Sequence, residues 1–228
     1  MDAVKKLFKP DGYFVMKFSK IQPETWVTIG IIVLFAIILI VYIKSRKDKM
    51  HMSTRMLVTG ALCLATAFIL SYIRVIDLPQ GGSVTVLSLM PLIIFSYIYG
   101  AVPGLIVCFA YSLLQIMQGT YVVHWMQFLL DYPLAFTLIG LSGLFRKNIY
   151  LSTMTGYLLR YICHVLSGIV FFAQYAAEAN FSSVVAYSTL YNSYAIIELI
   201  FALILISIPA LRNMLKRLKS QYSSPQKV

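Results

Sequence analysis

The chain has 228 residues, of which 60% are hydrophobic and only 12% are charged, and its formal net charge is +11. A soluble domain carries about 25% charged residues, so most of this chain must face lipid or pack inside a helix bundle. The positive charge does not indicate a nucleic-acid-binding protein, because the lysines and arginines cluster between apolar runs, as the positive-inside rule predicts for membrane proteins.

The first apolar run, residues 26–43, has about the length that a helix needs to cross a membrane. No small-x-small cleavage site follows it, so the run does not have the pattern of a cleaved signal peptide. If it spans, the lysine-rich segment before it lies outside, against the positive-inside rule. We therefore predict that residues 1–50 form an appendage with an extra N-terminal transmembrane helix.

Further apolar runs follow at short intervals and predict an all-α integral membrane protein with a six-helix core bundle. The short connections predict that consecutive helices pack as antiparallel neighbours. The core occupies residues 51–212 and is followed by a basic cytoplasmic tail, residues 213–228. The six runs are residues 56–73, 84–99, 103–117, 127–144, 154–172 and 184–208.

Basic residues alternate between the ends of these helices. The segment of residues 44–55, the pair Arg146 and Lys147, and the end of the last run with its tail are all rich in lysine and arginine. The loops between them on the other side carry few charges. By the positive-inside rule, the basic side is cytoplasmic, which predicts a multi-pass membrane protein with a cytoplasmic C-terminus.

Polar residues inside the predicted bundle require an explanation, because an ionisable group in a membrane helix costs about 3 kcal/mol even on insertion scales. The alternating helix directions place Asp131, His164 and Asn192 at one depth, in the outer half. This agreement predicts a pocket for a small solute. Arg160 lies deeper, and we expect its charged end to extend to the cytoplasmic interface. Glu198 is expected to pair with another helix or to face a partner protein.

Two of these positions support more than one interpretation. Asp131 follows Gln127 by four residues on one helix face; it is either a carboxylate paired to a neighbouring helix or the counter-charge of a bound cation. His164, Gly168 and Phe172 repeat every four residues, so they share one stripe. That stripe suits a flat ligand, although a glycine there also suits close helix packing.

Sequence motifs argue against several enzyme classes. The chain contains no G-x-x-x-x-G-K-[ST], H-E-x-x-H or G-x-S-x-G sequence, so neither ATP hydrolysis nor metalloprotease or serine-hydrolase chemistry is expected. Its three cysteines show no metal-binding spacing. We expect no catalytic role, metal or cofactor. A small membrane enzyme using His164 and Asp131 as an acid–base pair, and a purely structural bundle partner, remain as alternatives.

Three segments together resemble the thiamine-specific substrate-binding subunits of energy-coupling-factor transporters. They are YVVHWMQFLLDYP (121–133), RYICHVLSGIVFFAQYA (160–176) and AYSTLYN (186–192), within a resemblance that covers about residues 56–208. The resemblance implies a six-helix subunit of the bacterial cell membrane that binds thiamine from outside with high affinity. It also implies partners: one transmembrane coupling protein and two ATPase subunits, which alone would use ATP.

By position, the resemblance also implies a set of site residues. Thiamine combines a cationic thiazolium with an aminopyrimidine, so aromatic faces, a carboxylate and an amide suit it. Ala61 and Ala65 on the first core helix would contact the coupling protein, although ordinary helix packing explains their spacing equally well. The residues implied to bind thiamine are Tyr121, Asp131, Tyr132, His164, Gly168, Phe172, Tyr187 and Asn192.

The chain departs from the family pattern at three places. Asp131 stands where the family usually has glutamate, and Phe172 stands where a tryptophan is expected. The first outer loop, residues 78–83, lacks the aromatic residue that covers the ligand in relatives, and Trp125 is a candidate substitute for the missing ring. A subunit for another vitamin such as riboflavin, or for a thiamine precursor, is therefore the alternative within this class.

Overall fold

The computed structural model describes residues 53–78 and 81–222 together with Gly30. Apart from Gly30, the predicted appendage of residues 1–50 with its membrane helix lies outside the described residues. The same holds for residues 223–228 of the predicted tail.

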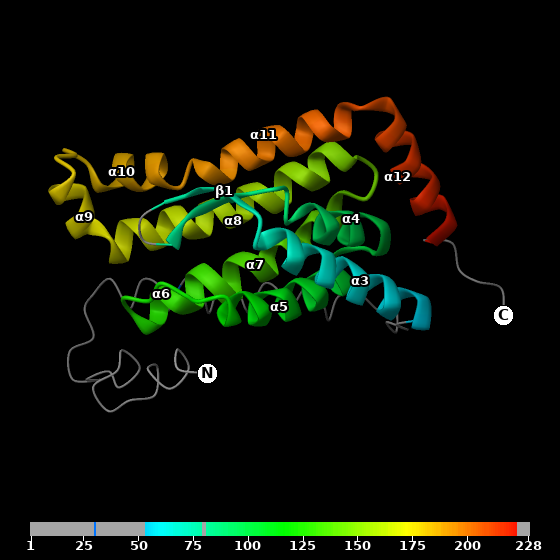
Figure 1. The fold of residues 1–228 in the computed structure, drawn as a ribbon, viewed down its shortest axis with the longest axis horizontal. Coiled ribbons are helices and arrows are strands. Elements are labelled where there is room, and N and C mark those ends of the chain that lie inside the picture. Colours follow the sequence, from blue (N-terminus) through cyan, green and yellow to red (C-terminus); the bar gives the residue numbers. More distant parts are fainter. Residues whose placement is uncertain (1–29, 31–52, 79–80, 223–228) are drawn as a thin grey trace.

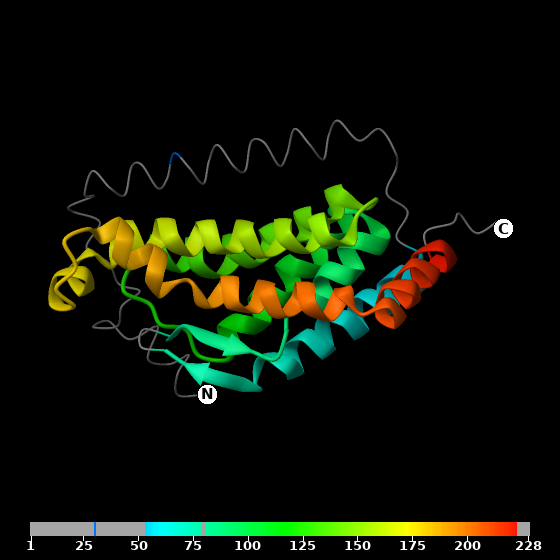
Figure 2. The same cartoon turned by 90° about the horizontal axis from the view of Figure 1, so that it is seen from above.

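The described chain is a helix bundle with one two-stranded antiparallel hairpin, and most helices run along the long axis of the molecule (Figure 1). The hairpin lies along one side of the bundle (Figure 2). In chain order the elements are α3 (Thr54–Ser71), β1 (Arg74–Asp77), β2 (Ser83–Thr85), α4 (Met90–Tyr99), α5 (Ala101–Met117), α6 (Trp125–Leu129), η2 (Leu130–Leu134), α7 (Ala135–Leu138), η3 (Ile139–Phe145), α8 (Ile149–Phe171), α9 (Ala173–Glu178), α10 (Val184–Tyr191), α11 (Tyr194–Ser207) and α12 (Pro209–Tyr222).

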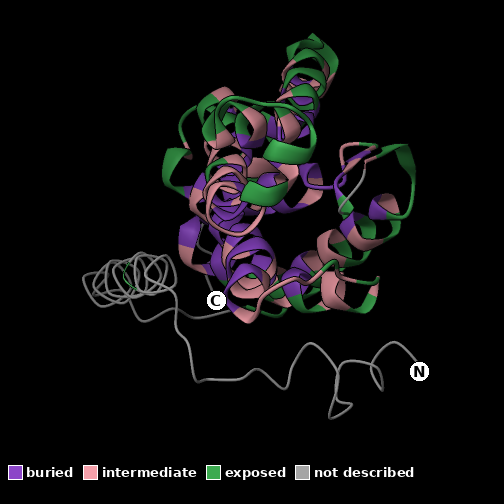
Figure 3. Ribbon diagram, turned by 90° about the vertical axis from the view of Figure 1, so that its left-hand side faces the viewer, coloured by how far each residue is buried: buried purple, intermediate pink, exposed green. Residues whose placement is uncertain are grey.

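Each of the six predicted core spans contains helix in the described chain, and the prediction of an all-α membrane fold is confirmed. Four helical segments of the described chain are long and apolar enough to cross a membrane, and α4 and α5 are shorter apolar helices. The buried residues lie inside the bundle and the exposed ones face outward (Figure 3). Many exposed side chains are apolar, such as Leu62 and Ile69 on α3, each 64% exposed, as a lipid-facing surface requires.

The prediction of one helix over residues 84–99 is wrong. Residues 83–85 form β2, and α4 begins only at Met90, where Pro91 occupies the first turn. Proline at that position costs no hydrogen bond, because the first amides of a helix have no partner within it. The strand pairs with β1, with Asp77 opposite Ser83, so this apolar run begins with the end of a strand and becomes helical only at Met90.

Two other predicted helices are interrupted. The run from residue 127 to 144 contains the π-helical turn η2 at Pro133 and ends in the 3-10 helix η3. Proline donates no backbone hydrogen bond, which explains why the regular pattern changes there. The last run breaks at Asn192 and Ser193 between α10 and α11.

Helix α12 joins the bundle rather than only following it. It packs against α4 and buries Leu215, which is 1% exposed, while its basic residues face outward or lie half-buried. In Figure 1 it turns across the end of the bundle. The predicted boundary between residues 212 and 213 therefore falls within a helix.

The centre of the bundle depends on glycines where η3 crosses α5. A Cβ atom on Gly140 would lie 2.3 Å from the backbone nitrogen of Leu105, and one on Gly104 would lie 2.9 Å from the Gly140 carbonyl oxygen. Backbone atoms cannot move aside as a flexible side chain can. The crossing therefore requires glycine at position 140.

We predict that Gly140→Ala destabilises the protein by about 2 kcal/mol or more, because the added methyl overlaps the α5 backbone. Thermal unfolding in detergent measures the effect. The matched control is Gly156→Ala, whose Cβ would meet only the Ile93 and Ile139 side chains, at 3.2 Å or more, and whose melting temperature is expected to stay close to wild type. Equal effects of the two substitutions would contradict this interpretation.

Candidate ligand-binding site

A cavity of about 120 Å³ opens between the helices and the hairpin. One buried water needs roughly a tenth of this volume on the same measure, so a small organic molecule fits. The residues that line it come from α3, the hairpin, α5, α6, η2, α7, α8, α10 and α11 and from the loops beside them. Polar and aromatic side chains predominate among them.

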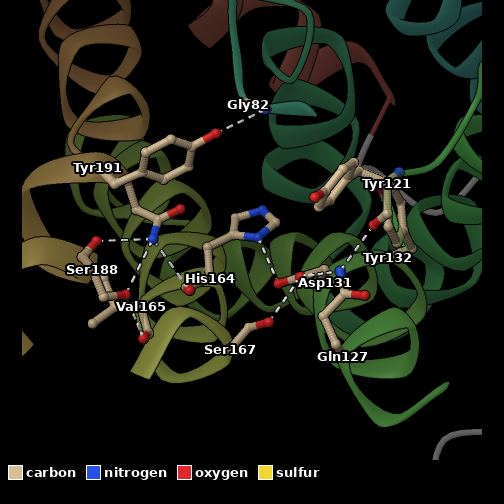
Figure 4. Close-up of polar contacts among 11 residues, drawn as sticks. Gly82, Tyr121, Gln127, Asp131, Tyr132, His164, Val165, Ser167, Ser188 and Tyr191 are labelled. Carbon is tan, nitrogen blue, oxygen red and sulfur yellow. Dashed lines mark hydrogen bonds and ion pairs between the residues drawn. The ribbon is translucent and has the colours of Figure 1, made fainter. Parts of the chain in front are cut away.

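The buried carboxylate of Asp131 has hydrogen-bonding partners on two sides in the cavity wall (Figure 4). Its Oδ2 accepts hydrogen bonds from Gln127 Nε2 at 2.6 Å and from Ser167 Oγ at 2.8 Å, and its Oδ1 lies 3.0 Å from His164 Nδ1. An ionised carboxylate only accepts hydrogen bonds, so an ionised Asp131 requires His164 Nδ1 as the donor of this hydrogen bond. His164 Nε2 is buried without a hydrogen-bond partner among the described residues and is left as an acceptor for a ligand.

The π-helical turn η2 shapes this part of the site. It contains both Asp131 and Tyr132 just before Pro133, and such turns often occur where a helix carries function. Asp131 faces α8, while the Tyr132 hydroxyl accepts a hydrogen bond from the backbone N–H of Tyr121 at 3.0 Å. One turn of helix therefore connects the acid to α8 and also connects the preceding loop to the cavity.

Asn192 lies at the break between α10 and α11. Its Nδ2 donates to the carbonyl oxygens of Ser188 at 2.9 Å and His164 at 3.2 Å, which leaves the amide oxygen as an acceptor. Asparagine side chains that bond to nearby backbone compete with the helical pattern, so Asn192 accounts for both the break and the contact with α8.

Gly168 makes this contact possible. A Cβ atom there would lie 2.0 Å from Ser188 Oγ, whose hydroxyl donates to the Val165 carbonyl oxygen at 2.8 Å. The two interpretations of Gly168 therefore hold together: it lines the cavity and it allows α8 and α10 to pack closely.

Aromatic rings line the cavity on both sides of His164, with Tyr121 and Tyr132 on one side and Tyr191 on the other (Figure 4). Tyr121 stacks on Phe172 with centroids 6.2 Å apart. Tyr191 stacks on Tyr187 at 6.1 Å, and its hydroxyl accepts from the hairpin amide of Gly82 at 3.4 Å. Such faces suit flat and cationic ligands.

The expectation that Arg160 extends to the cytoplasmic interface is wrong. Its Nη1 lies 3.5 Å from Glu198 Oε2, with the two side chains 11% and 1% exposed, and Arg160 lines the cavity. Its guanidinium also lies 5.1 Å from the ring centroid of Phe136. Glu198 on α11 therefore pairs with another helix, α8, which was one of the two expectations for this residue.

All eight residues implied by the resemblance line this one cavity. Trp125 lies outside it and stacks on His124 at 5.9 Å; burial lowers the pKa of that histidine.

Sequence reasoning missed Ser167, although its spacing of three residues from His164 was a usable signal. It also missed the wall supplied by the hairpin, because residues 84 and 85 were expected to start a helix.

Ala61 and Ala65 are both exposed on α3, away from the cavity. Packing within the described chain therefore does not explain their spacing. The surface around them is apolar and includes Val58 and Leu62, which are 55% and 64% exposed.

Comparisons with known proteins agree on one family. The thiamine transporter protein family (Thia_YuaJ) matches residues 57–218. The thiamine transporter ThiT of Bacillus subtilis is 32% identical, over 68% of this chain and 92% of that protein. The ThiT of Lacticaseibacillus paracasei is 26% identical, over 63% and 80%. The solved structure of ThiT from Listeria monocytogenes shares the fold with a TM-score of 0.56 at 23% identity, covering 68% of this chain and 96% of that one.

We predict that Gly168→Ala destabilises the protein by about 1–3 kcal/mol, because the methyl overlaps the Ser188 side chain. The effect is measured by thermal unfolding in a double-mutant cycle, in which Gly168→Ala is made both in the wild-type protein and in a Ser188→Gly variant. The cost should largely disappear in that background, where the overlapping atoms are absent. An equal cost in both backgrounds would show that Ser188 is not the reason for the glycine.

Proposed function

This chain belongs to the thiamine transporter protein family, and we propose that it captures thiamine at the outer side of the bacterial cell membrane and passes it inward. The family consists of transporters, so the chain is a membrane transport protein and not an enzyme. An acid–base role for His164 and Asp131 is therefore set aside, and the same two residues are assigned to ligand binding.

The observation that carries the proposal is the buried carboxylate of Asp131 in a cavity lined with aromatic rings. Its hydrogen-bond partners are a histidine, an amide and a hydroxyl, so no lysine or arginine bonds to it in the described chain. A buried acid without a cationic partner is costly, and the permanent charge of the thiazolium offsets that cost.

The remaining polar atoms suit the aminopyrimidine half. His164 Nε2 is an acceptor without a partner in the described chain, and an exocyclic amino group can donate to it. The amide oxygen of Asn192 offers a second acceptor. The rings of Tyr121, Phe172 and Tyr187 provide faces for stacking. Riboflavin, in contrast, is larger and carries no cation for Asp131.

We further propose that a separate energy-coupling module drives the inward step, with a transmembrane coupling protein and two ATPase subunits. This chain contains no phosphate-binding loop of its own. The exposed small-residue face of α3, at Ala61 and Ala65, would let a partner helix approach closely. The basic end with α12 would then lie in the cytoplasm.

Asp131→Asn and His164→Ala are each expected to weaken thiamine binding by more than about 1.5 kcal/mol, or about tenfold, because each removes a hydrogen bond to a charged group. Calorimetry on the purified protein measures the dissociation constants. Glu178→Gln, which alters an exposed carboxylate on α9, is the control and should bind as wild type does. Unchanged affinity in both site variants, or no binding by wild type at micromolar thiamine, would refute the proposal.

Replacing Ala61 or Ala65 with leucine should abolish thiamine uptake by cells while leaving thiamine binding by the purified protein unchanged. The added side chain keeps a partner helix at a distance but points away from the cavity. Ala67→Leu, at a buried position on the same helix, should instead destabilise the bundle itself. Loss of binding in the Ala61 and Ala65 variants would show that this face packs within the chain.

A further inference from the structure

The charges that line the cavity follow a simple pattern. Three charged side chains line it, namely Arg74, Asp131 and Arg160. Each arginine is accompanied by a carboxylate of its own, Asp77 at 3.3 Å and Glu198 at 3.5 Å. Asp131 has no lysine or arginine paired with it among the described residues; its neighbour at 3.0 Å is the imidazole of His164. Counted over the arginine and carboxylate side chains alone, the net charge of the site is −1.

The two arginine pairs differ in how strongly they act on a ligand. Arg74 and Asp77 are 40% and 68% exposed, so water and salt screen their charges. Arg160 and Glu198 are 11% and 1% exposed, where charges act over longer distances because less water surrounds them. A change in the charge of Arg160 or Glu198 would therefore alter the electric field inside the cavity more than a change at Arg74 or Asp77.

Several contacts hold the Arg160–Glu198 pair in place. Glu198 Oε1 accepts hydrogen bonds from both the backbone N–H and the hydroxyl of Thr85, which leaves Oε2 for Arg160. The guanidinium lies between the rings of Phe136 and Tyr194, at 5.1 and 5.7 Å from their centroids. Arg160 therefore places a positive charge in the cavity wall, whereas Glu198 lies behind that wall and does not line the cavity.

We propose that the Arg160–Glu198 pair sets the charge selectivity of the site. By cancelling each other, the two residues leave a single negative charge at Asp131, which one monocationic ligand neutralises. If Glu198 were neutral, Arg160 would offset Asp131 and repel a thiazolium. If Arg160 were neutral, the site would carry two negative charges. The inference rests on the proposed thiamine binding and adds two positioning residues to it.

The test compares thiamine with its neutral analogue, in which a thiophene ring replaces the thiazolium, so that shape is kept and charge is removed. Calorimetry on the full chain in detergent gives both dissociation constants. Glu198→Gln should weaken thiamine binding about tenfold, since unit charges about 10 Å apart interact on this scale at the effective dielectric constant of proteins. Binding of the neutral analogue should change by no more than about twofold.

Two further variants make the test independent of whether Glu198→Gln folds. Arg160→Gln should shift the preference in the opposite direction, raising the ratio of thiamine affinity to analogue affinity. The double variant Arg160→Gln with Glu198→Gln restores the net charge of −1 and should return the ratio to about that of wild type. Arg160→Lys keeps the charge and should preserve the ratio.

A merely structural ion pair predicts different results. In that case every substitution would weaken the binding of thiamine and of the neutral analogue alike. The ratio of the two affinities would stay unchanged and the melting temperature would fall, and this outcome would overturn the inference. Wild-type protein that binds the neutral analogue and not thiamine, or neither ligand, would instead refute the proposed function. Opposite shifts of the ratio in the two single variants, cancelled in the double variant, would support charge selectivity.

Discussion

The hydrogen bonds to Asp131 are the constraint on which the rest of the structure depends. An acid inside a membrane bundle is tolerated only if its oxygens are satisfied, and here the donors come from its own helix and from α8. Meeting that requirement fixes the rotation of α8 relative to η2 and turns His164 toward the acid. The binding cavity is the space that remains beside this contact.

The irregular elements surround this cavity. The π-helical turn at Pro133, the break at Asn192 and the hairpin at residues 74–85 all contribute residues to the wall. Each leaves backbone or side-chain polar groups that a continuous helix would have used internally, and non-helical backbone inside a membrane protein is tolerated where it lines a cavity. The regular helices, in contrast, supply most of the core, such as the fully buried Leu92 and Phe95 of α4.

Much of this was predictable from the sequence, because burial in a membrane makes each polar residue conspicuous. The depths of Asp131, His164 and Asn192 predicted a common pocket, and that pocket exists. The ion pair of Arg160 was not predictable from depth alone, since a long side chain can reach either an interface or a partner. The hairpin was missed because residues 84–99 read as one mostly apolar run, and periodicity does not separate a short strand from a helix segment within such a run.

The departures from the family pattern acquire a physical meaning in this setting. The shorter acid at position 131 still reaches His164, with Oδ1 3.0 Å from Nδ1. Phe172 likewise offers less surface than the expected tryptophan. However, Phe172 stacks on Tyr121 with centroids 6.2 Å apart and contacts Tyr175 in a tilted arrangement at 5.8 Å, and the two tyrosine hydroxyls are 2.7 Å apart. A hydrogen-bonded cluster of three rings thus replaces one large ring, and its position depends on the loop that carries Tyr121.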